Sequence, residues 1–232
     1  MFIVDDWPLI GSPLPLVAIF CAYVVLVFVA LPRFMRHRDA FDLRFVMRTY
    51  NIIQVFTCCY FIKVLHTNGL RFENMWKCIH DDDNRTNTAH YHFIFLRMFE
   101  FLETIFFVLR KKQKQVSLLH VYHHISTVAL LYLFLKYSGG VMGVYLGFVN
   151  SAVHIVMYSY YFLSSFVTYK RFTTYIKPYI TKLQITQLIL LLGQCVAAVM
   201  CDVPKHIQAM YVVQAFNIVL LLIMFIAFHA KQ

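Results

Sequence analysis

Residues 118–135 read LLHVYHHISTVALLYLFL, a stretch without formal charge that has three histidines near its start. A run of about twenty apolar residues is long enough to cross the hydrocarbon core of a bilayer as an α-helix. Further apolar runs occur along the 232-residue chain, which is 60% hydrophobic and 14% charged. Soluble domains mix apolar and charged residues more evenly. The sequence therefore predicts an all-α, polytopic membrane protein that forms one transmembrane domain over residues 1–232.

The apolar runs predict seven transmembrane helices, at about 14–32, 46–66, 91–109, 116–137, 141–163, 184–201 and 207–228. The first run begins after the sequence SPLP and ends at Pro32, and proline is common where a helix stops. Asp5 and Asp6 precede this run, whereas a cleavable signal peptide has basic residues there. We therefore expect the first helix to be a retained anchor.

The connections between these runs differ in charge. Arg33–Arg48, Arg110–Lys114 and Lys170–Lys182 hold most of the 21 basic residues, and with seven spans they lie on one side. Acidic residues, including the run Asp81–Asp83, gather on the other side. Because an excess of Lys and Arg marks the cytosolic face, we predict a lumenal N-terminus and a cytosolic C-terminus.

Two features of the predicted lumenal side agree with this orientation. The tripeptide NRT at Asn84–Thr86 is an acceptor sequence for N-glycosylation. Cys78 and Cys201 also lie on this side, where disulfides persist. We predict a Cys78–Cys201 bridge, and chance placement of two cysteines is the alternative.

The histidines of the opening stretch form a candidate site. His120, His123 and His124 stand at i, i+3 and i+4, so they share one face of a helix. They follow the basic turn RKKQK, at the cytosolic end of the predicted fourth span. A single histidine there would be a packing residue. Three on one face favour chemistry, because ionisable groups inside a membrane are functional candidates.

Other polar residues lie at a similar depth in the membrane. They also recur at helical spacing on their own spans: Asn150, His154 and Tyr158; Arg97, Glu100 and Glu103; Gln184 and Gln187. For the arginine and the two glutamates, a structural ion network is the alternative to a catalytic role, since charges in hydrocarbon need partners. For the glutamines, the alternative is a bond that joins two helices.

Three kinds of chemistry can use these side chains. The first is a metal centre, because HxxHH occurs in membrane di-iron desaturases and hydroxylases. Those enzymes carry several such boxes, so one box plus His154 supplies too few ligands for two irons, although a single zinc remains open. The second is nucleophilic catalysis, in which a neutral imidazole attacks a thioester and becomes acylated. The third is general-base catalysis by a histidine near its working pKa.

The ordered series of motifs resembles the ELO family of very-long-chain fatty acid elongases, the 3-oxoacyl-CoA synthases of the endoplasmic reticulum. The likeness runs from SPLP through PRFMRHRDAFDLRFVMRTYNIIQV, FEFLETIFFVLRKK, HVYHH, NSAVHIVMYSYY and TKLQITQ to CDVP. HxxHH alone is a weak signal, whereas FFVLRKK shortly before HVYHH is specific. The resemblance implies seven helices, six of which enclose a closed-ended tunnel for an acyl tail.

The resemblance also implies a reaction, catalogued as EC 2.3.1.199. A long-chain acyl-CoA condenses with malonyl-CoA, which releases CO2 and CoA and lengthens the chain by two carbons. His123 would be the nucleophile, while His120 and His124 orient it and move protons. His154 and Asn150 would polarise the thioester carbonyl or stabilise the enolate. No metal and no cofactor are expected, since acyl-CoA and malonyl-CoA are the substrates.

Further expectations concern substrates and partners. Phosphates of coenzyme A would meet basic side chains as charge-assisted acceptors, and polar residues would line the site: Lys111, Lys112, Lys114, Lys177, Lys182, Tyr158, Gln184 and Gln187. The resemblance implies a multi-pass protein of the endoplasmic reticulum membrane that serves fatty acid and sphingolipid biosynthesis. It also implies contact with the lipid bilayer, homo- or heterodimers and other elongation-cycle enzymes, with no nucleic acid partner.

Two positions depart from the family pattern Lys, Glu, Asp, Thr in the third span. Arg97 replaces the lysine and Glu103 replaces the aspartate. Both changes keep the sign of the charge, but arginine is a planar fork where lysine is a compact ammonium. An alternative function is therefore a weak or silent paralogue that binds acyl-CoA or supports an active partner. A seven-helix receptor is a third reading, in which HVYHH beside a basic turn has no purpose.

Overall fold

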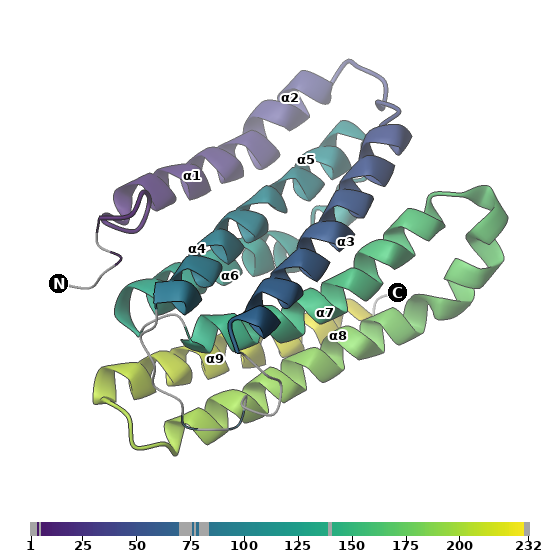
Figure 1. Ribbon diagram of the computed structural model, residues 1–232. Coiled ribbons are helices and arrows are strands. Elements are labelled where there is room, and N and C mark those ends of the chain that lie inside the picture. The colour runs from purple at the N-terminus through teal and green to yellow at the C-terminus, as the bar shows by residue number, and fades with distance from the viewer. Residues whose placement is uncertain are drawn as a thin grey trace.

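Helices make up nearly all of the chain that the computed structural model describes, namely residue 4 and residues 6–69, 76, 78, 84–138 and 141–229. No strand occurs in these residues, as predicted for an all-α protein. The helices run side by side in a bundle (Figure 1). A helix bonds its own backbone N–H and C=O groups internally, which is what hydrocarbon surroundings require.

The first helical segment has three parts. α1 (Leu14–Val25) continues through a short π-helical stretch, η1 (Leu26–Ala30), into α2 (Leu31–Met35). Pro32 has no backbone N–H and cannot bond to the carbonyl four residues earlier. The π-helical widening lies directly before it, and such widened turns accommodate a break in the bonding pattern. Pro32 therefore lies inside the segment rather than at its end.

The remaining elements are α3 (Arg44–Thr67), α4 (Asn84–Phe99), α5 (Phe101–Leu109), η3 (Gln113–Gln115), α6 (Leu118–Tyr137), α7 (Val141–Ser164), η4 (Val167–Tyr169), α8 (Lys170–Val199) and α9 (Lys205–His229). Only Glu100 separates α4 from α5. The predicted start of the sixth span at 184 is wrong for the helix, which begins at Lys170. Basic residues and Pro178 make this part less apolar, yet it stays helical.

Within the described ranges, five segments are long and apolar enough to cross a membrane: Leu14–Met35, Arg44–Thr67, Leu118–Tyr137, Val167–Val199 and Lys205–Ala227. Large apolar side chains such as Phe56, Phe216 and Ile223 are exposed on the outside of the bundle, and a wide apolar surface fits contact with lipid. The chain is thus a multi-pass membrane protein. The prediction of seven spans is confirmed only in part, because α4, α5 and α7 are not among these segments.

The helices are arranged as a ring with one segment outside it. Going around, α3 packs against α7, α7 against α8, α8 against α9, α9 against α6, α6 against α4, and α4 against α3. The segment α1–α2 lies outside this ring and packs on α5 (Figure 1). The connections α2–α3, α5–α6 and α7–α8 lie at the same end of the bundle (Figure 1). The predicted basic segments therefore meet at one end, which we call the basic end.

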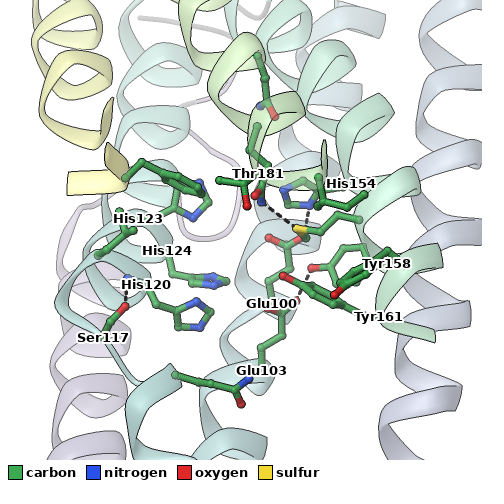
Figure 2. Close-up of a pocket in the computed structure, with 18 of the residues that line it drawn as sticks. Glu100, Glu103, Ser117, His120, His123, His124, His154, Tyr158, Tyr161 and Thr181 are labelled. Atoms are coloured by element: carbon green, nitrogen blue, oxygen red, sulfur yellow. Dashed lines mark hydrogen bonds and ion pairs between the residues drawn. The ribbon is translucent and has the colours of Figure 1, made fainter. Parts of the chain in front are cut away.

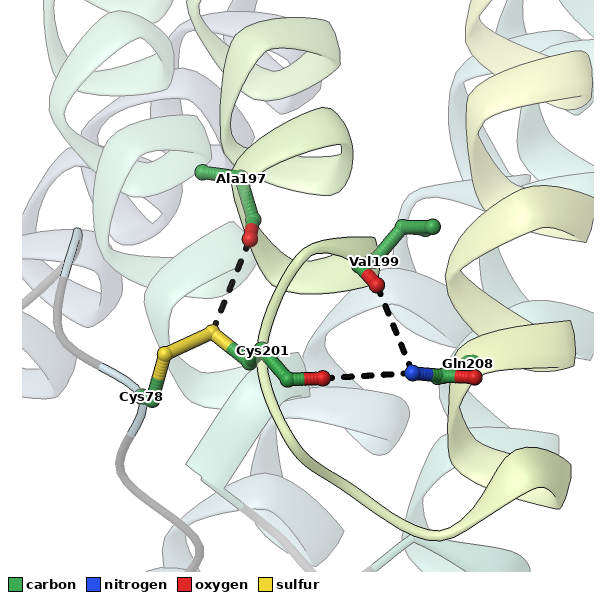
Figure 3. The surroundings of a disulfide bond; sticks show 5 residues. All are labelled: Cys78, Ala197, Val199, Cys201 and Gln208. Atoms are coloured by element: carbon green, nitrogen blue, oxygen red, sulfur yellow. Dashed lines mark hydrogen bonds between the residues drawn. A yellow bond between two sulfur atoms is a disulfide. The ribbon is translucent and has the colours of Figure 1, made fainter.

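A disulfide lies at the opposite end of the bundle. It joins Cys78, between α3 and α4, to Cys201, in the turn between α8 and α9 (Figure 3). Gln208 of α9 donates from Nε2 to the carbonyls of Val199 and Cys201, at 3.4 and 3.2 Å (Figure 3). The Val199 carbonyl belongs to the last residue of α8, where a helix leaves its last acceptors unpaired, and the Cys201 carbonyl belongs to the turn. The α8–α9 turn is therefore held from two sides.

Candidate active site

A cavity of about 450 Å³ lies between α4–α5, α6, α7, α8 and α9. Most of the predicted site residues line it: His120, His123, His124, Asn150, His154, Tyr158, Lys177, Gln184, Gln187, Glu100 and Glu103. Figure 2 shows the α6 histidines on one side of this cavity, with His154 and Tyr158 facing them from the other side. Residues that lie far apart in the sequence thus meet in one site.

The start of α6 fixes where its three histidines project. Ser117 is the N-cap residue, in extended backbone, and its side chain accepts a hydrogen bond from the backbone N–H of His120 at 3.2 Å. Such a cap satisfies a donor that the first turn cannot pair. The ring centres of His120 and His124 are 4.3 Å apart, and those of His123 and His124 are 5.6 Å apart. The box is therefore a compact imidazole cluster.

His120 is tied to two other helices. Its Nε2 atom lies 2.9 Å from Thr104 Oγ1, on α5. The same hydroxyl lies 2.6 Å from the hydroxyl of Tyr23, on α1. This chain of bonds sets the ring orientation of His120 and joins the outer segment to the site.

His123 differs from His120 in how its ring is held. Within the described part of the chain, its ring makes no hydrogen bond to another side chain, and it lines the cavity. His124 also lacks such a bond there, but it is only 6% exposed and packs beside Phe101, at 6.1 Å between ring centres. His123 is thus the histidine of the box most open to a ligand.

His154 sits in a network of buried polar groups. Arg97 forms an ion pair with Glu100, at 2.7 Å between Nη1 and Oε1, and donates to Asn150 Oδ1 at 2.8 Å. His154 Nδ1 lies 3.0 Å from Glu100 Oε1 and 2.7 Å from Arg97 Nη1. It therefore donates to the glutamate in one tautomer and accepts from the arginine in the other. The Nε2 atom lies 3.3 Å from the Asn150 amide nitrogen.

Glu103 has a different set of partners from Glu100. It accepts hydrogen bonds from the hydroxyls of Tyr50, at 3.0 Å, and Tyr158. Gln54 in turn donates to the Tyr50 hydroxyl at 2.7 Å and to the Tyr158 hydroxyl at 3.4 Å. The predicted ion network therefore holds for Arg97 and Glu100, while Glu103 belongs to a tyrosine cluster. The Glu103 carboxylate lies inside the ring of helices, away from water, and so needs hydrogen-bond donors. The two tyrosine hydroxyls provide them.

Sequence reasoning missed Tyr50, Gln54 and Tyr23, and noted Thr104 only as part of a motif. They are neutral residues inside apolar runs, and their relevance depends on how α1 and α3 are rotated. A weak signal existed on α3, since Tyr50 and Gln54 are four residues apart and share a face.

The five predicted lysines do not share one location. Lys177 lines the cavity described above, and Lys112 lines a neighbouring one. Lys111, Lys114 and Lys182 are exposed and line neither cavity. Lys182 lies over the Tyr179 ring, with its Nζ atom 5.5 Å from the ring centre.

One group of side chains has the composition of a metal site. Glu103, His120 and His124 each offer one ligand atom, and these atoms lie within 4.8 Å of one another. Two imidazoles and a carboxylate are a common ligand set for zinc. The single-zinc alternative from the sequence would therefore be placed here, and the expectation of no metal stays a prediction.

The helices and the cavity define a class: a multi-pass, all-helical membrane protein with an imidazole-lined site toward one end of its bundle. A sequence model of the ELO family, described as the GNS1/SUR4 family, matches residues 8–232. The chain belongs to this family.

Curated relatives agree with this assignment. The chain is 30% identical over 230 residues to very long chain fatty acid elongase 4 of Mus musculus, covering 96% of this chain and 73% of the relative. It is 33% identical over 193 residues to very long chain fatty acid elongase 1 of Homo sapiens, covering 81% and 69%. It is 34% identical over 193 residues to very long chain fatty acid elongase 7 of Drosophila melanogaster, covering 81% and 59%.

Proposed function

We propose that this protein is a very-long-chain 3-oxoacyl-CoA synthase, EC 2.3.1.199, which condenses a long-chain acyl-CoA with malonyl-CoA. The observation that carries the proposal is the single cavity that His123 and His154 both line from facing helices. Leu188, Leu221 and Phe225 line the same cavity and supply apolar surface for an acyl tail. The relatives named as very long chain fatty acid elongases support this reading.

The proposal includes a topology. In it, α4–α5 and α7 also cross the membrane, which brings the number of spans to seven. α7 has 24 residues, and at 1.5 Å per residue such a helix exceeds the roughly 30 Å hydrocarbon core. Arg97 of α4 and Glu100, which follows α4, form an ion pair inside the bundle. Each therefore provides the partner that a charge within a membrane needs. The six helices of the ring would then enclose the acyl tunnel.

The basic end would face the cytosol, where both CoA thioesters are dissolved, and the disulfide end would face the lumen of the endoplasmic reticulum. Coenzyme A is too highly charged to enter hydrocarbon, while its acyl tail belongs there. A site near the basic end fits that division. Lys177 lies at the cavity and would meet a phosphate.

In the first step, a ring nitrogen of His123 attacks the thioester carbonyl, and the carbon–sulfur bond breaks. The proton on the other nitrogen of His123 passes through His124 or His120 to the departing sulfur, so coenzyme A leaves as a thiol. The product is an acyl-imidazole, and no metal or cofactor takes part. His120, oriented by Thr104, and His124 position the nucleophile.

In the second step, malonyl-CoA loses its carboxylate as CO2. The electron pair of that bond forms the new carbon–carbon bond to the acyl group, and the bond to His123 breaks. One proton taken up from solvent restores the imidazole. His154, with Asn150 beside it, would polarise the thioester carbonyl or stabilise the enolate.

Intact-mass measurement after incubation with acyl-CoA alone tests the proposal. We expect a covalent adduct of one acyl group on the wild-type protein, its loss on addition of malonyl-CoA, and no adduct on His123→Ala. Normal condensation without an adduct would reject the covalent step. No condensation with any acyl-CoA, together with retained acyl-CoA binding, would favour the silent paralogue instead.

A further inference from the structure

Tyr23 is connected to the imidazole cluster from outside the ring of helices. It lies on α1, is 4% exposed and does not line the cavity. Its side chain contacts two residues of α5, Thr104 through the hydroxyl and Phe101 through the ring. Each of these two residues contacts a different histidine of HVYHH. One residue of the outer segment therefore reaches the box by two routes.

The first route passes through aromatic rings. Tyr23 stacks on Phe101, with ring centres 4.4 Å apart and an angle of 19° between the planes. Phe101 in turn meets the ring of His124 edge to face, at 6.1 Å between ring centres. Stacked and edge-to-face pairs are both favourable arrangements of rings. This route depends on the ring of the tyrosine and not on its hydroxyl.

The second route is a chain of two hydrogen bonds. The Tyr23 hydroxyl lies 2.6 Å from Thr104 Oγ1, which lies 2.9 Å from His120 Nε2. Thr104 is 0% exposed, so water does not compete for its hydroxyl. The direction of these bonds matters, because the two ring nitrogens of a neutral histidine have different roles.

The number of available partners determines this direction. Within the described part of the chain, Thr104 is the one hydrogen-bond partner of the Tyr23 hydroxyl. A buried hydroxyl that fails to donate leaves its hydrogen unpaired, which costs free energy, so the phenol donates to Thr104. The hydrogen of the threonine then points to its other partner, and His120 Nε2 accepts it. The proton of a neutral His120 ring is therefore on Nδ1.

Resting on the proposed function, we propose that Tyr23 is a positioning residue that holds His120 in the tautomer with the proton on Nδ1. Nε2 is occupied by Thr104, so Nδ1 is the nitrogen that remains for the cavity, which His120 lines. An N–H group there can donate to the sulfur of the departing coenzyme A, where negative charge develops. The other tautomer would present a lone pair instead. His124 is then the residue that carries the proton from His123.

Solid-state NMR reads this tautomer directly and without substrate. The protein is labelled with ¹³C,¹⁵N-histidine in phosphatidylcholine liposomes, and comparison with His120→Asn assigns the signals of His120. We expect a protonated Nδ1 and an unprotonated Nε2 in the wild type. In Tyr23→Phe, Thr104 can accept as well as donate, so both tautomers should appear. A wild-type ring with a proton on Nε2 would overturn the proposal, and so would an unchanged tautomer in Tyr23→Phe.

Steady-state condensation measures what the tautomer contributes to the reaction. Tyr23→Phe keeps the ring that stacks on Phe101 and removes the hydroxyl. We expect kcat to fall about fivefold, the effect of one hydrogen bond. The KM values for acyl-CoA and malonyl-CoA should stay within about twofold of wild type, because Tyr23 does not touch the substrates.

Tyr132→Phe is the matched control. Tyr132 is 5% exposed, and its hydroxyl donates to the carbonyl of Ile10 at 3.3 Å. This variant also loses a buried hydrogen bond of a tyrosine, but one without a link to the histidines, so its kcat should equal that of the wild type. An equal fall of kcat in Tyr23→Phe and Tyr132→Phe would show a general effect on packing and overturn the proposal.

A double-mutant cycle separates an effect through Thr104 from an independent one. Thr104→Val already breaks the chain, so adding Tyr23→Phe should change kcat by less than about twofold. Multiplication of the two single effects would show that Tyr23 acts by another route and would overturn the proposal. If the proposed function is wrong, the tautomer and its change in Tyr23→Phe are still expected, while the wild-type protein itself does not condense the two substrates.

Discussion

The Nε2 atom of His120 lies 2.9 Å from the Oγ1 atom of Thr104, so the first histidine of HVYHH is oriented by the helix before it. Tyr23 holds the same threonine from outside the ring of helices. The orientation of the His120 ring thus depends on Thr104 and Tyr23, which do not line the cavity.

Thr104→Val keeps the shape of the side chain and removes its hydroxyl. We expect kcat to fall about tenfold, because His120 loses the bond that orients it. Thr104→Ser keeps the hydroxyl and lacks the methyl group, so it should have nearly the wild-type rate. If the methyl group mattered only for packing, Thr104→Ser would be impaired instead. Steady-state condensation with one acyl-CoA measures both, and an unchanged kcat in Thr104→Val contradicts the positioning role.

Arg97→Gln should destabilise the fold by about 3 kcal/mol, because it leaves the Glu100 carboxylate buried without its cation. Both side chains are 2% exposed. The family residue, in Arg97→Lys, can keep the ion pair but cannot bond Glu100 and Asn150 as a planar fork does. We expect it to retain stability and change kcat. Thermal unfolding in detergent checks the first point, and Arg44→Gln, which breaks the exposed pair with Asp42, should leave the unfolding temperature nearly unchanged.

Cys201→Ser should lower stability by about 2 kcal/mol by opening the link to Cys78. The bridge spans 123 residues of sequence, but membrane insertion already limits the unfolded chain, so the gain is smaller than for a soluble loop. Gel mobility without reductant and thermal unfolding report the change. Cys21→Ser, at an exposed free cysteine, is the control and should alter neither.

Asn84 is exposed at the first residue of α4, and the proposed orientation puts it in the lumen. We therefore expect a glycan on the protein expressed in eukaryotic cells. Endoglycosidase should lower its apparent mass, and Asn84→Gln should run at that lower mass without treatment. An unmodified Asn84 would count against this orientation.

Chelation tests the expectation that no metal takes part. EDTA should leave condensation within about twofold of its rate, since imidazole acylation needs no Lewis acid. Added Zn²⁺ should inhibit by binding Glu103, His120 and His124, and Glu103→Gln should weaken that inhibition. Loss of activity in EDTA with recovery on Zn²⁺ would contradict the expectation.

Local spacing was sufficient to predict which residues of one helix share a face. The i, i+3, i+4 pattern of HVYHH and the i, i+4 pair Asn150 and His154 both point into one cavity. The hydrogen bonds of Glu103 could not be predicted, because Tyr50 and Tyr158 come from α3 and α7 and their rotation is a result of packing. The five predicted lysines show the same limit. Their charge predicts the side of the membrane on which they lie, but it does not predict which of them lines the cavity.

Helix ends were the least predictable part of the fold. Hydropathy falls where α8 gains basic residues and Pro178, yet the helix continues to Lys170. Polarity therefore reports where a helix meets water, while backbone hydrogen bonding determines where it stops. The length of α8, 30 residues, exceeds what the hydrocarbon core requires.

The turn between α8 and α9 is fixed by the disulfide to Cys78 and by the hydrogen bonds from Gln208. This has a consequence for the length of acyl chain that the protein accepts. In the proposed function the acyl tail runs from the imidazoles toward that turn. The end of the tunnel is then fixed in place and limits the length of the acyl chain that fits. Related proteins that prefer longer or shorter products would then differ in the size of the side chains that line the tunnel. The positions of their helices would be the same.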